Sequence, residues 1–135
     1  AASAEARQLR EQIRTDALAP VAGTRNGDVT VVLFSDYQCP YCRRFNSTLD
    51  ALIAADPKVR VVYRDWPIQG QASVLAARAH KDEIDALLVR NYRFAKIMGL
   101  EGTPGMLVGT YVVPGAADLK TMQQAVARAR KANEG

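Results

Sequence analysis

Two cysteines separated by two residues are the feature of this sequence that most directly indicates a reactive site. Cys39-Pro40-Tyr41-Cys42 contains both cysteines of the 135-residue chain. Two thiols at this spacing can close into a small disulfide, and at the start of a helix the exposed backbone N–H groups and the dipole stabilise a thiolate on the first thiol. The arrangement favours redox exchange. Cys39 would react with a substrate disulfide or thiol, and Cys42, one turn into the helix and more buried, would resolve the mixed disulfide.

Two other roles for the cysteine pair, a zinc site and a purely structural disulfide, are disfavoured by the sequence. A structural zinc ion usually takes four protein ligands, whereas the rest of the chain offers one histidine, His80, and no further cysteine. That histidine stands in a charged stretch and is better explained as a solvated side chain than as a base. A purely structural disulfide would close so short a loop that it restricts the unfolded chain little. We therefore expect redox catalysis or sensing with no metal and no cofactor beyond the disulfide, and Pro40 and Tyr41 tuning its reduction potential.

The apolar pattern predicts the elements that position the two thiols. Residues 29–34 are nearly continuous in β-branched and apolar residues, which is typical of a strand buried on both faces. A helix should begin near Cys39, with Pro40 in its first turn where a missing N–H costs nothing, and end by Asp56. The first thiol would thus lie at the junction of a central strand and a helix.

Further strands and helices are predicted around this unit. Residues 59–66 alternate apolar and charged side chains as a strand does, and a Gly109-Thr110 turn joins apolar runs into a hairpin over residues 106–113. Residues 19–28 are rich in turn formers, so they predict a loop. Helical spacing of apolar residues predicts helices over residues 4–18, 72–79, 84–98 and from Asp118 onward. This order predicts an α/β fold with a mixed central sheet flanked by helices.

The composition limits the chain to one domain and excludes several classes of partner. With 48% hydrophobic and 24% charged residues, it fits a globular domain, which we divide into an N-terminal helix within residues 1–20 and a main domain over residues 21–135. No apolar run approaches the roughly 20 residues of a membrane-spanning helix, so we expect no stable membrane insertion. The first residues lack the pattern of a signal peptide, which suggests a mature chain. The net charge of +4 is spread without a block of like charges, so we expect no nucleic-acid partner.

The residues around the cysteines resemble the DsbA-like branch of the thioredoxin superfamily. The similar segments are residues 26–31, 34–45, 65–68, 102–104 and 112–115. The resemblance implies a thioredoxin-like fold and thiol–disulfide exchange with cysteine-containing protein substrates. It also implies a periplasmic or otherwise exported location and a membrane redox partner that reoxidises or reduces the protein. It makes no prediction of the oligomeric state.

The resemblance also implies how substrates dock. It implies that the Thr103-Pro104 peptide bond is cis and faces the disulfide. Such a bond would expose the backbone of Thr103, which can pair with an extended substrate strand beside Cys39. Tyr37 and Tyr41 flank the cysteines and are expected to contact substrate.

The sequence departs from the family in two ways. DsbA-like proteins often carry a buried glutamate six residues before the first cysteine, placed to exchange protons with the inner thiol, and that position here is Leu33. Asp36, nearer the rim, is the residue we expect could transfer the proton instead. The second departure is length, because residues 72–98 have room for only about two helices where the family inserts a helical subdomain. We interpret them as a remnant of that insertion, with a missing piece at His80-Lys81.

The sequence therefore predicts an exported thiol–disulfide oxidoreductase, with disulfide formation favoured. The Pro40-Tyr41 dipeptide resembles glutaredoxins, DsbG and ScsC more than the Pro-His of strongly oxidising DsbA, so we expect a moderately oxidising potential. The alternatives are a disulfide isomerase or reductase of the DsbG or ScsC type, a cytoplasmic glutaredoxin-like reductase that uses glutathione, and a binding or chaperone module on a thioredoxin scaffold whose disulfide is incidental.

Overall fold

The computed structural model of the chain describes residues 20–24, 26–68, 71–80 and 84–132, together with positions 4, 8, 11 and 12. The helix predicted over residues 4–18 lies outside the described residues apart from those four positions, which are helical. The division of the chain after residue 20 stays a prediction.

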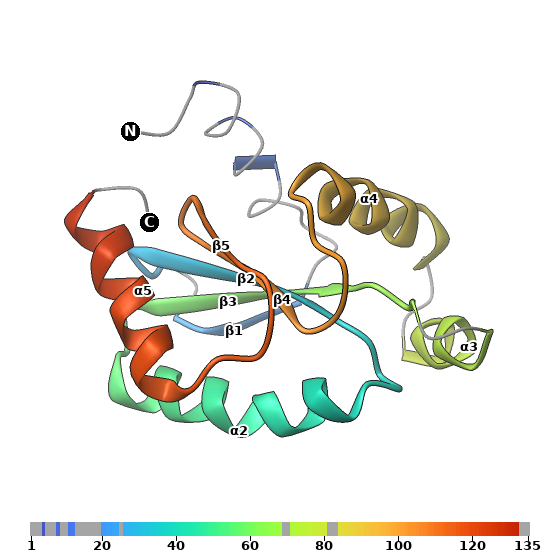
Figure 1. Ribbon diagram of the computed structural model, residues 1–135, viewed down its shortest axis with the longest axis horizontal. Coiled ribbons are helices and arrows are strands. Elements are labelled where there is room, and N and C mark those ends of the chain that lie inside the picture. Colours follow the sequence, from blue (N-terminus) through green and yellow to red (C-terminus); the bar gives the residue numbers. More distant parts are fainter. Residues whose placement is uncertain are drawn as a thin grey trace.

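The described strands form one mixed sheet in the order β1-β3-β2-β4-β5 (Figure 1). At its centre β2 (Val29–Ser35) runs parallel to β3 (Val59–Asp65). The remaining strands pair antiparallel: β1 (Val21–Gly23) with β3, β4 (Gly105–Val108) with β2, and β5 (Tyr111–Val113) with β4. The predicted mixed sheet, its two longer strands and the final hairpin are confirmed.

The strand β1 corrects the loop predicted over residues 19–28. It is a three-residue edge strand whose residues are exposed or half-buried, so no apolar pattern marks it in the sequence. Gly23 ends it with φ +78°, and a Cβ at that position would lie 2.6 Å from the Val59 carbonyl oxygen. Glycine is therefore required where the chain turns closely past β3.

The described helices are α2 (Pro40–Ala55), α3 (Gln71–His80), α4 (Ile84–Ile97) and α5 (Leu119–Lys131). Three of them, α2, α4 and α5, pack against the faces of the sheet, whereas α3 lies beyond its end (Figure 1). On one face lie α2 and α5, and α5 begins at the predicted cap, because the Asp118 carboxylate accepts the Thr121 backbone N–H at 2.8 Å. None of the described helices is long and apolar enough to cross a membrane.

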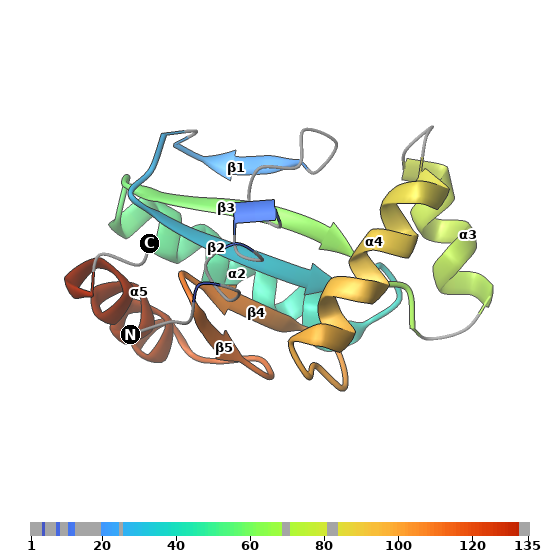
Figure 2. The same ribbon diagram turned by 90° about the horizontal axis from the view of Figure 1, so that it is seen from above.

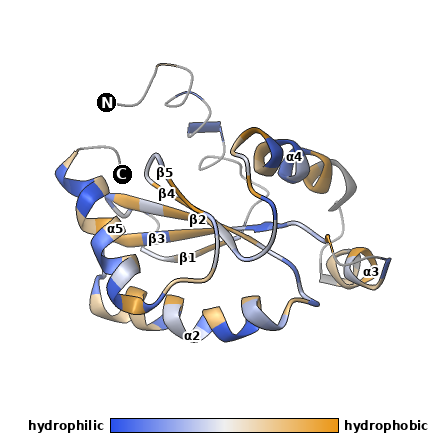
Figure 3. Cartoon of the chain, viewed as in Figure 1, coloured by the Kyte–Doolittle hydropathy of each residue, from blue (hydrophilic) through white to orange (hydrophobic). Residues whose placement is uncertain are grey.

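The central strand β2 is buried on both faces, as its sequence predicts. Val29, Val31 and Leu33 pack in the core beneath α2 and α5, whereas Val32 and Phe34 pack in the core on the opposite face. Figure 3 shows the hydrophobic colour concentrated along the strands and hydrophilic colour on outward turns of the helices. Burial of each such side chain contributes about 1.5–3 kcal/mol, so β2 is held firmly in place.

The helices α3 and α4 match the two helices predicted between the second strand and the hairpin. Figure 2 shows both at the end of the sheet toward which β2 and β3 point. Ala77 of α3 packs with Leu87 and Leu88 of α4 in a small core of their own. The missing piece expected at His80-Lys81 falls next to residues 81–83, which lie outside the described residues, and the remnant interpretation of residues 72–98 stays a prediction.

Candidate active site

Cys39 is the N-cap residue of α2, where the chain has just left β2. Its backbone is extended (φ −87°, ψ 115°), Pro40 is the first helical residue, and the sulfur accepts the Cys42 backbone N–H at 3.2 Å. Both cysteines are free thiols in this structure. A side-chain oxygen usually fills the capping position. Because a sulfur fills it here, the N–H groups and the dipole of the helix act directly on a Cys39 thiolate.

The loop before β4 brings Thr103 and Pro104 to the same place. Their peptide bond is cis, as the resemblance implies. The Cys39 thiol donates a hydrogen bond to the Thr103 carbonyl oxygen at 3.5 Å, across 64 positions of sequence. The structure thus brings together the cysteine pair and the loop that the sequence singles out, although the role of Thr103 and Pro104 in substrate docking stays a prediction.

The pKa values of the two thiols move in opposite directions. Burial raises the pKa of Cys39, but a hydrogen bond from the Cys42 thiol and the nearby Thr103 hydroxyl act against it. The backbone N–H groups of Cys42 and Tyr41 also lower it, and the pKa of Cys39 ends below its ordinary value. Burial and the hydrogen bond with Cys39 raise the pKa of Cys42 to about 11. At neutral pH Cys39 is therefore the better nucleophile and Cys42 keeps its proton.

The exposure of the two thiols is similar. Both cysteines are buried, with Cys39 1% and Cys42 5% exposed, so surface exposure alone does not mark Cys42 as the more buried residue. The reason is the packing around α2: Thr103 contacts the sulfur of Cys39, while Cys42 lines a cavity on another side of the helix. Each thiol therefore has its own surroundings within one helical turn.

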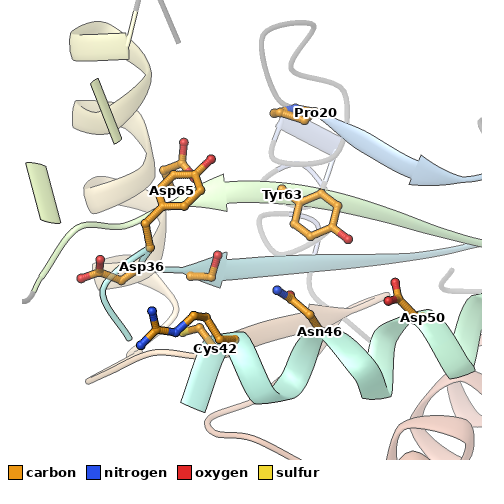
Figure 4. A pocket seen from close by; sticks show the side chains of 10 residues that line it. Pro20, Asp36, Cys42, Asn46, Asp50, Tyr63 and Asp65 are labelled. Atoms are coloured by element: carbon orange, nitrogen blue, oxygen red, sulfur yellow. The ribbon is translucent and has the colours of Figure 1, made fainter. Parts of the chain in front are cut away.

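That cavity lies between α2 and the ends of β2 and β3 and has a volume of about 540 Å³ (Figure 4). Cys42 lines it from the first turn of α2, and Asp50 lines it from further along the same helix. Asp36, Tyr63 and Asp65 line it from the sheet and the loop after β2. Several carboxyl groups thus share a solvent space with the inner thiol.

Asp36 connects the active-site loop to the segment after β3. Its side chain is buried, and its two carboxylate oxygens accept the backbone N–H groups of Gln38 at 2.9 Å and Ile68 at 3.0 Å. The backbone N–H of Asp36 also lowers the pKa of Cys42, against the larger effect of burial. The residue therefore fixes the geometry of the loop, and its expected part in proton transfer stays a prediction.

Leu33 occupies the position at which the family often has a glutamate. It is 1% exposed and packs in the core beneath α2, so it supplies no group that could exchange a proton. Asp65, which the sequence analysis did not single out, is a buried carboxylate that lines the cavity with Cys42. The signal that could have found it is register, since Asp65 is the partner of Ser35 on the parallel strand that leads to the cysteines.

The two tyrosines beside the cysteines lie at the surface. Tyr37 is 38% exposed and Tyr41 is 62% exposed, and the Arg44 guanidinium stacks over the Tyr41 ring at 4.6 Å. Both positions fit the substrate contact expected of them, which stays a prediction. The His80 side chain lies outside the described residues. Within the described ranges, no group of three or more histidine, cysteine, aspartate or glutamate residues could hold a metal ion.

Comparison with known proteins relates this geometry to other chains. The family model described as DSBA-like thioredoxin domain matches residues 30–81. A thioredoxin-like oxidoreductase from Silicibacter pomeroyi is 34% identical, with 90% of this chain and 98% of that chain covered and a TM-score of 0.86. The chain belongs to the thioredoxin-like oxidoreductases.

Two further proteins are similar to this chain, one over part of its sequence and the other in its fold. Disulfide bond formation protein D of Bacillus subtilis (strain 168) is 37% identical over 67 residues, which is 47% of this chain and 30% of that protein. The chain thus spans about a third of the length of this curated relative. A periplasmic thioredoxin-like protein from Salmonella enterica serovar Typhimurium shares the fold, at 22% identity, 90% and 95% coverage and a TM-score of 0.82.

The Silicibacter relative also bears on the short helical region of this thioredoxin-like domain. Because 98% of that chain is covered by 90% of this one, a domain of the same compact extent exists in another member.

Proposed function

We propose that this thioredoxin-like oxidoreductase exchanges disulfides with cysteine-containing protein substrates and favours disulfide formation in them. Cys39 is the nucleophile, Cys42 is the resolving thiol, and their disulfide is the redox group, with no other cofactor. The observation that carries the proposal is the contrast between the thiols, because hydrogen bonds hold the pKa of Cys39 below its ordinary value while the pKa of Cys42 is raised to about 11.

The reaction follows from that contrast. A substrate thiolate attacks the Cys39 sulfur of the disulfide, the bond between Cys39 and Cys42 breaks, and Cys42 leaves and takes up a proton. A second substrate thiolate then displaces Cys39 as a thiolate, which leaves the substrate oxidised and the protein reduced by two electrons. Stabilisation of the Cys39 thiolate favours the reduced protein and so makes the disulfide a stronger oxidant.

The docking residues in this proposal surround Cys39. An extended substrate segment would lie along the loop of Thr103 and Pro104 and pair with its backbone, as strands pair with an open edge. The exposed rings of Tyr37 and Tyr41 would contact substrate side chains on either side of the cysteines. Pro40 and Tyr41, between the thiols, would set the reduction potential.

The proposed location is the periplasm or another exported compartment. Catalytic disulfides that form bonds in other proteins work where thiols are not kept reduced, and one structural neighbour is described as periplasmic. There, a membrane redox partner would reoxidise the thiols after each turnover.

The direction of the reaction is tested by a redox titration of the cysteine pair against glutathione. We expect a potential clearly more oxidising than the roughly −270 mV of thioredoxin. A thioredoxin-like value would overturn disulfide formation as the function and favour a reductase. Parallel assays of dithiol-peptide oxidation and scrambled-disulfide repair distinguish an oxidase from an isomerase.

The variant Cys39→Ser tests whether the function depends on thiol–disulfide exchange. It should abolish both activities, because no nucleophile remains at the N-cap of α2. Substrate binding and function that survive this change would instead make the protein a binding module with an incidental disulfide.

A further inference from the structure

The proposed reaction requires Cys42 to exchange a proton. With a pKa of about 11, this thiol is protonated at neutral pH, so it must lose the proton before it attacks a mixed disulfide at Cys39. In the opposite direction, Cys42 leaves as a thiolate and must regain the proton. A nearby group that accepts and returns the proton speeds such steps. Leu33, in the core beneath α2, cannot supply one.

The cavity beside α2 gives the Cys42 proton a route. Cys42 lines this space of about 540 Å³, and Cys39 is not among its lining residues. A water molecule needs about 30 Å³ and a few polar partners, so the cavity has room for several waters in contact with its carboxylates. The inner thiol therefore has access to water on a side of the helix that Cys39 does not line.

Asp65 stands at the sheet wall of this cavity. It is the last residue of β3, 5% exposed, and its register partner in β2 is Ser35. Because side chains alternate along a strand, Ser35 and Asp65 share the face of the sheet on which Leu33 and its partner Tyr63 lie, the face covered by α2. Asp65 is thus one strand across and two residues along from the position at which the family has its glutamate.

The geometry points to Asp65 as the group that exchanges the Cys42 proton with solvent, through water in this cavity. This inference rests on the proposed function. In the resolving step, water relays the thiol proton to the Asp65 carboxylate, and the Cys42 thiolate attacks the Cys39 sulfur. The bond between the two cysteines forms, the bond from Cys39 to the substrate breaks, and the substrate leaves as a thiolate with the electron pair. The reverse step returns the proton from Asp65 to Cys42.

Other charged and titratable groups face the same cavity and fit the role less well. The carboxylate of Asp36 has each oxygen engaged by a backbone N–H. Asp50 lies eight positions beyond Cys42 along α2 and is exposed. Arg43 is a cation, and burial raises the pKa of both Tyr37 and Tyr63, which keeps them neutral. Asp65 is a buried carboxylate on the sheet wall of the cavity that the inner thiol lines from α2.

A two-step reaction separates the roles of the residues. An uncharged dipyridyl disulfide added to the reduced protein releases one chromogenic thione when Cys39 attacks and a second when Cys42 displaces the mixed disulfide. The first phase reports the proposed nucleophile, and the second phase reports the proton of Cys42. The variants are Asp65→Asn, Asp65→Glu and the matched control Asp50→Asn, each with its unfolding midpoint measured.

We expect Asp65→Asn to slow the second phase about 100-fold at neutral pH, at the lower end of general acid–base contributions, and to leave the first phase unchanged. The second phase of this variant should then rise tenfold per pH unit toward about pH 11, the pKa of Cys42, whereas the unaltered protein gives a flatter profile. Asp65→Glu should restore most of the rate, and Asp50→Asn should match the unaltered protein.

The results separate a failure of the proposed role of Asp65 from a failure of the proposed function. Absence of the first phase in the unaltered protein contradicts the proposed function. If the first phase is normal and Asp65→Asn does not slow the second phase, the role of Asp65 is contradicted and the proposed function is not. The same holds if Asp50→Asn slows the second phase equally, or if Asp36→Asn slows it more. If Asp65→Asn does not fold, the test uses the unaltered protein in heavy water. The second phase should be slower there than in ordinary water, and equal rates in the two solvents would contradict proton transfer through water.

Discussion

Replacement of Thr103 by valine should make Cys39 a weaker thiolate without disturbing the fold. The Thr103 hydroxyl is buried, has no conventional hydrogen-bond partner among the described residues, and lowers the pKa of both Cys39 and Cys42. A hydroxyl can rotate to donate a hydrogen bond once the thiolate forms, and a hydrogen bond to a charged group is worth about 1.5–3 kcal/mol. At 1.36 kcal/mol per pKa unit, Thr103→Val should raise the pKa of Cys39 by about 1 to 2.

The same loss should make the disulfide a weaker oxidant. Because about 1.4 kcal/mol corresponds to 30 mV for this two-electron couple, the potential should become about 30–60 mV more reducing. Valine has the shape of threonine, and the Thr103 carbonyl that accepts the Cys39 thiol is unchanged, so substrate docking through the backbone should survive. Ultraviolet absorbance of the thiolate against pH gives the pKa, and a glutathione titration gives the potential.

Thr103→Ser is the matched control for this prediction. It keeps the hydroxyl and loses only a methyl group, so both values should stay near those of the unaltered protein. A pKa of Cys39 that stays constant in Thr103→Val, or that moves equally in both variants, would refute the argument that the hydroxyl stabilises the thiolate.

Three further predictions concern the stability of the domain. The pKa of Cys42 is raised from its ordinary 9.0 to about 11 by folding, so the folded state keeps a proton that the unfolded state releases in this range. The reduced protein should therefore lose about 2 kcal/mol relative to the oxidised protein as pH rises from 9 to 11, in urea titrations of both forms. Arg130→Met should cost about 1 kcal/mol or less, and less still at high salt, because its ion pairs with Asp28 at 2.7 Å and Asp56 at 3.0 Å are partly exposed; a larger, salt-independent loss would contradict this. Leu33→Glu should destabilise the domain by about 3 kcal/mol or more, since it places a carboxyl group in the apolar core beneath α2; thermal unfolding measures it, and an unchanged midpoint would mean that the carboxylate reaches the cavity.

The features predicted correctly from the sequence are those that depend on the residue pattern of one short segment. The continuous apolar run of β2 requires burial on both faces, and a proline directly after Cys39 marks the first turn of α2. The adjacent Thr103-Pro104 motif could be placed through a family resemblance. In each case neighbouring residues in the chain carry the information, and the structure agrees.

The features that the sequence missed depend on packing between distant segments. β1 exists because the edge of β3 is open to it, although its own residues carry no pattern. The burial of Cys39 follows from where the loop of Thr103 lies, 64 positions away. Asp65 becomes relevant to Cys42 only when β2 and β3 are aligned in register. The residue pattern of a single segment carries no information about these contacts between distant segments.

The separate surroundings of the two thiols explain how one helical turn can serve two tasks. Cys39 bonds to the carbonyl of Thr103, in the loop that would hold the substrate, whereas Cys42 lines the cavity beside the sheet and burial has the largest effect on its pKa. Substitutions in the loop should therefore act on affinity and potential, and substitutions at the sheet wall should act on the rate of the resolving step. Because the two sets of residues come from different elements, substitutions in the docking loop that keep the Thr103 side chain should leave the proposed proton route unchanged.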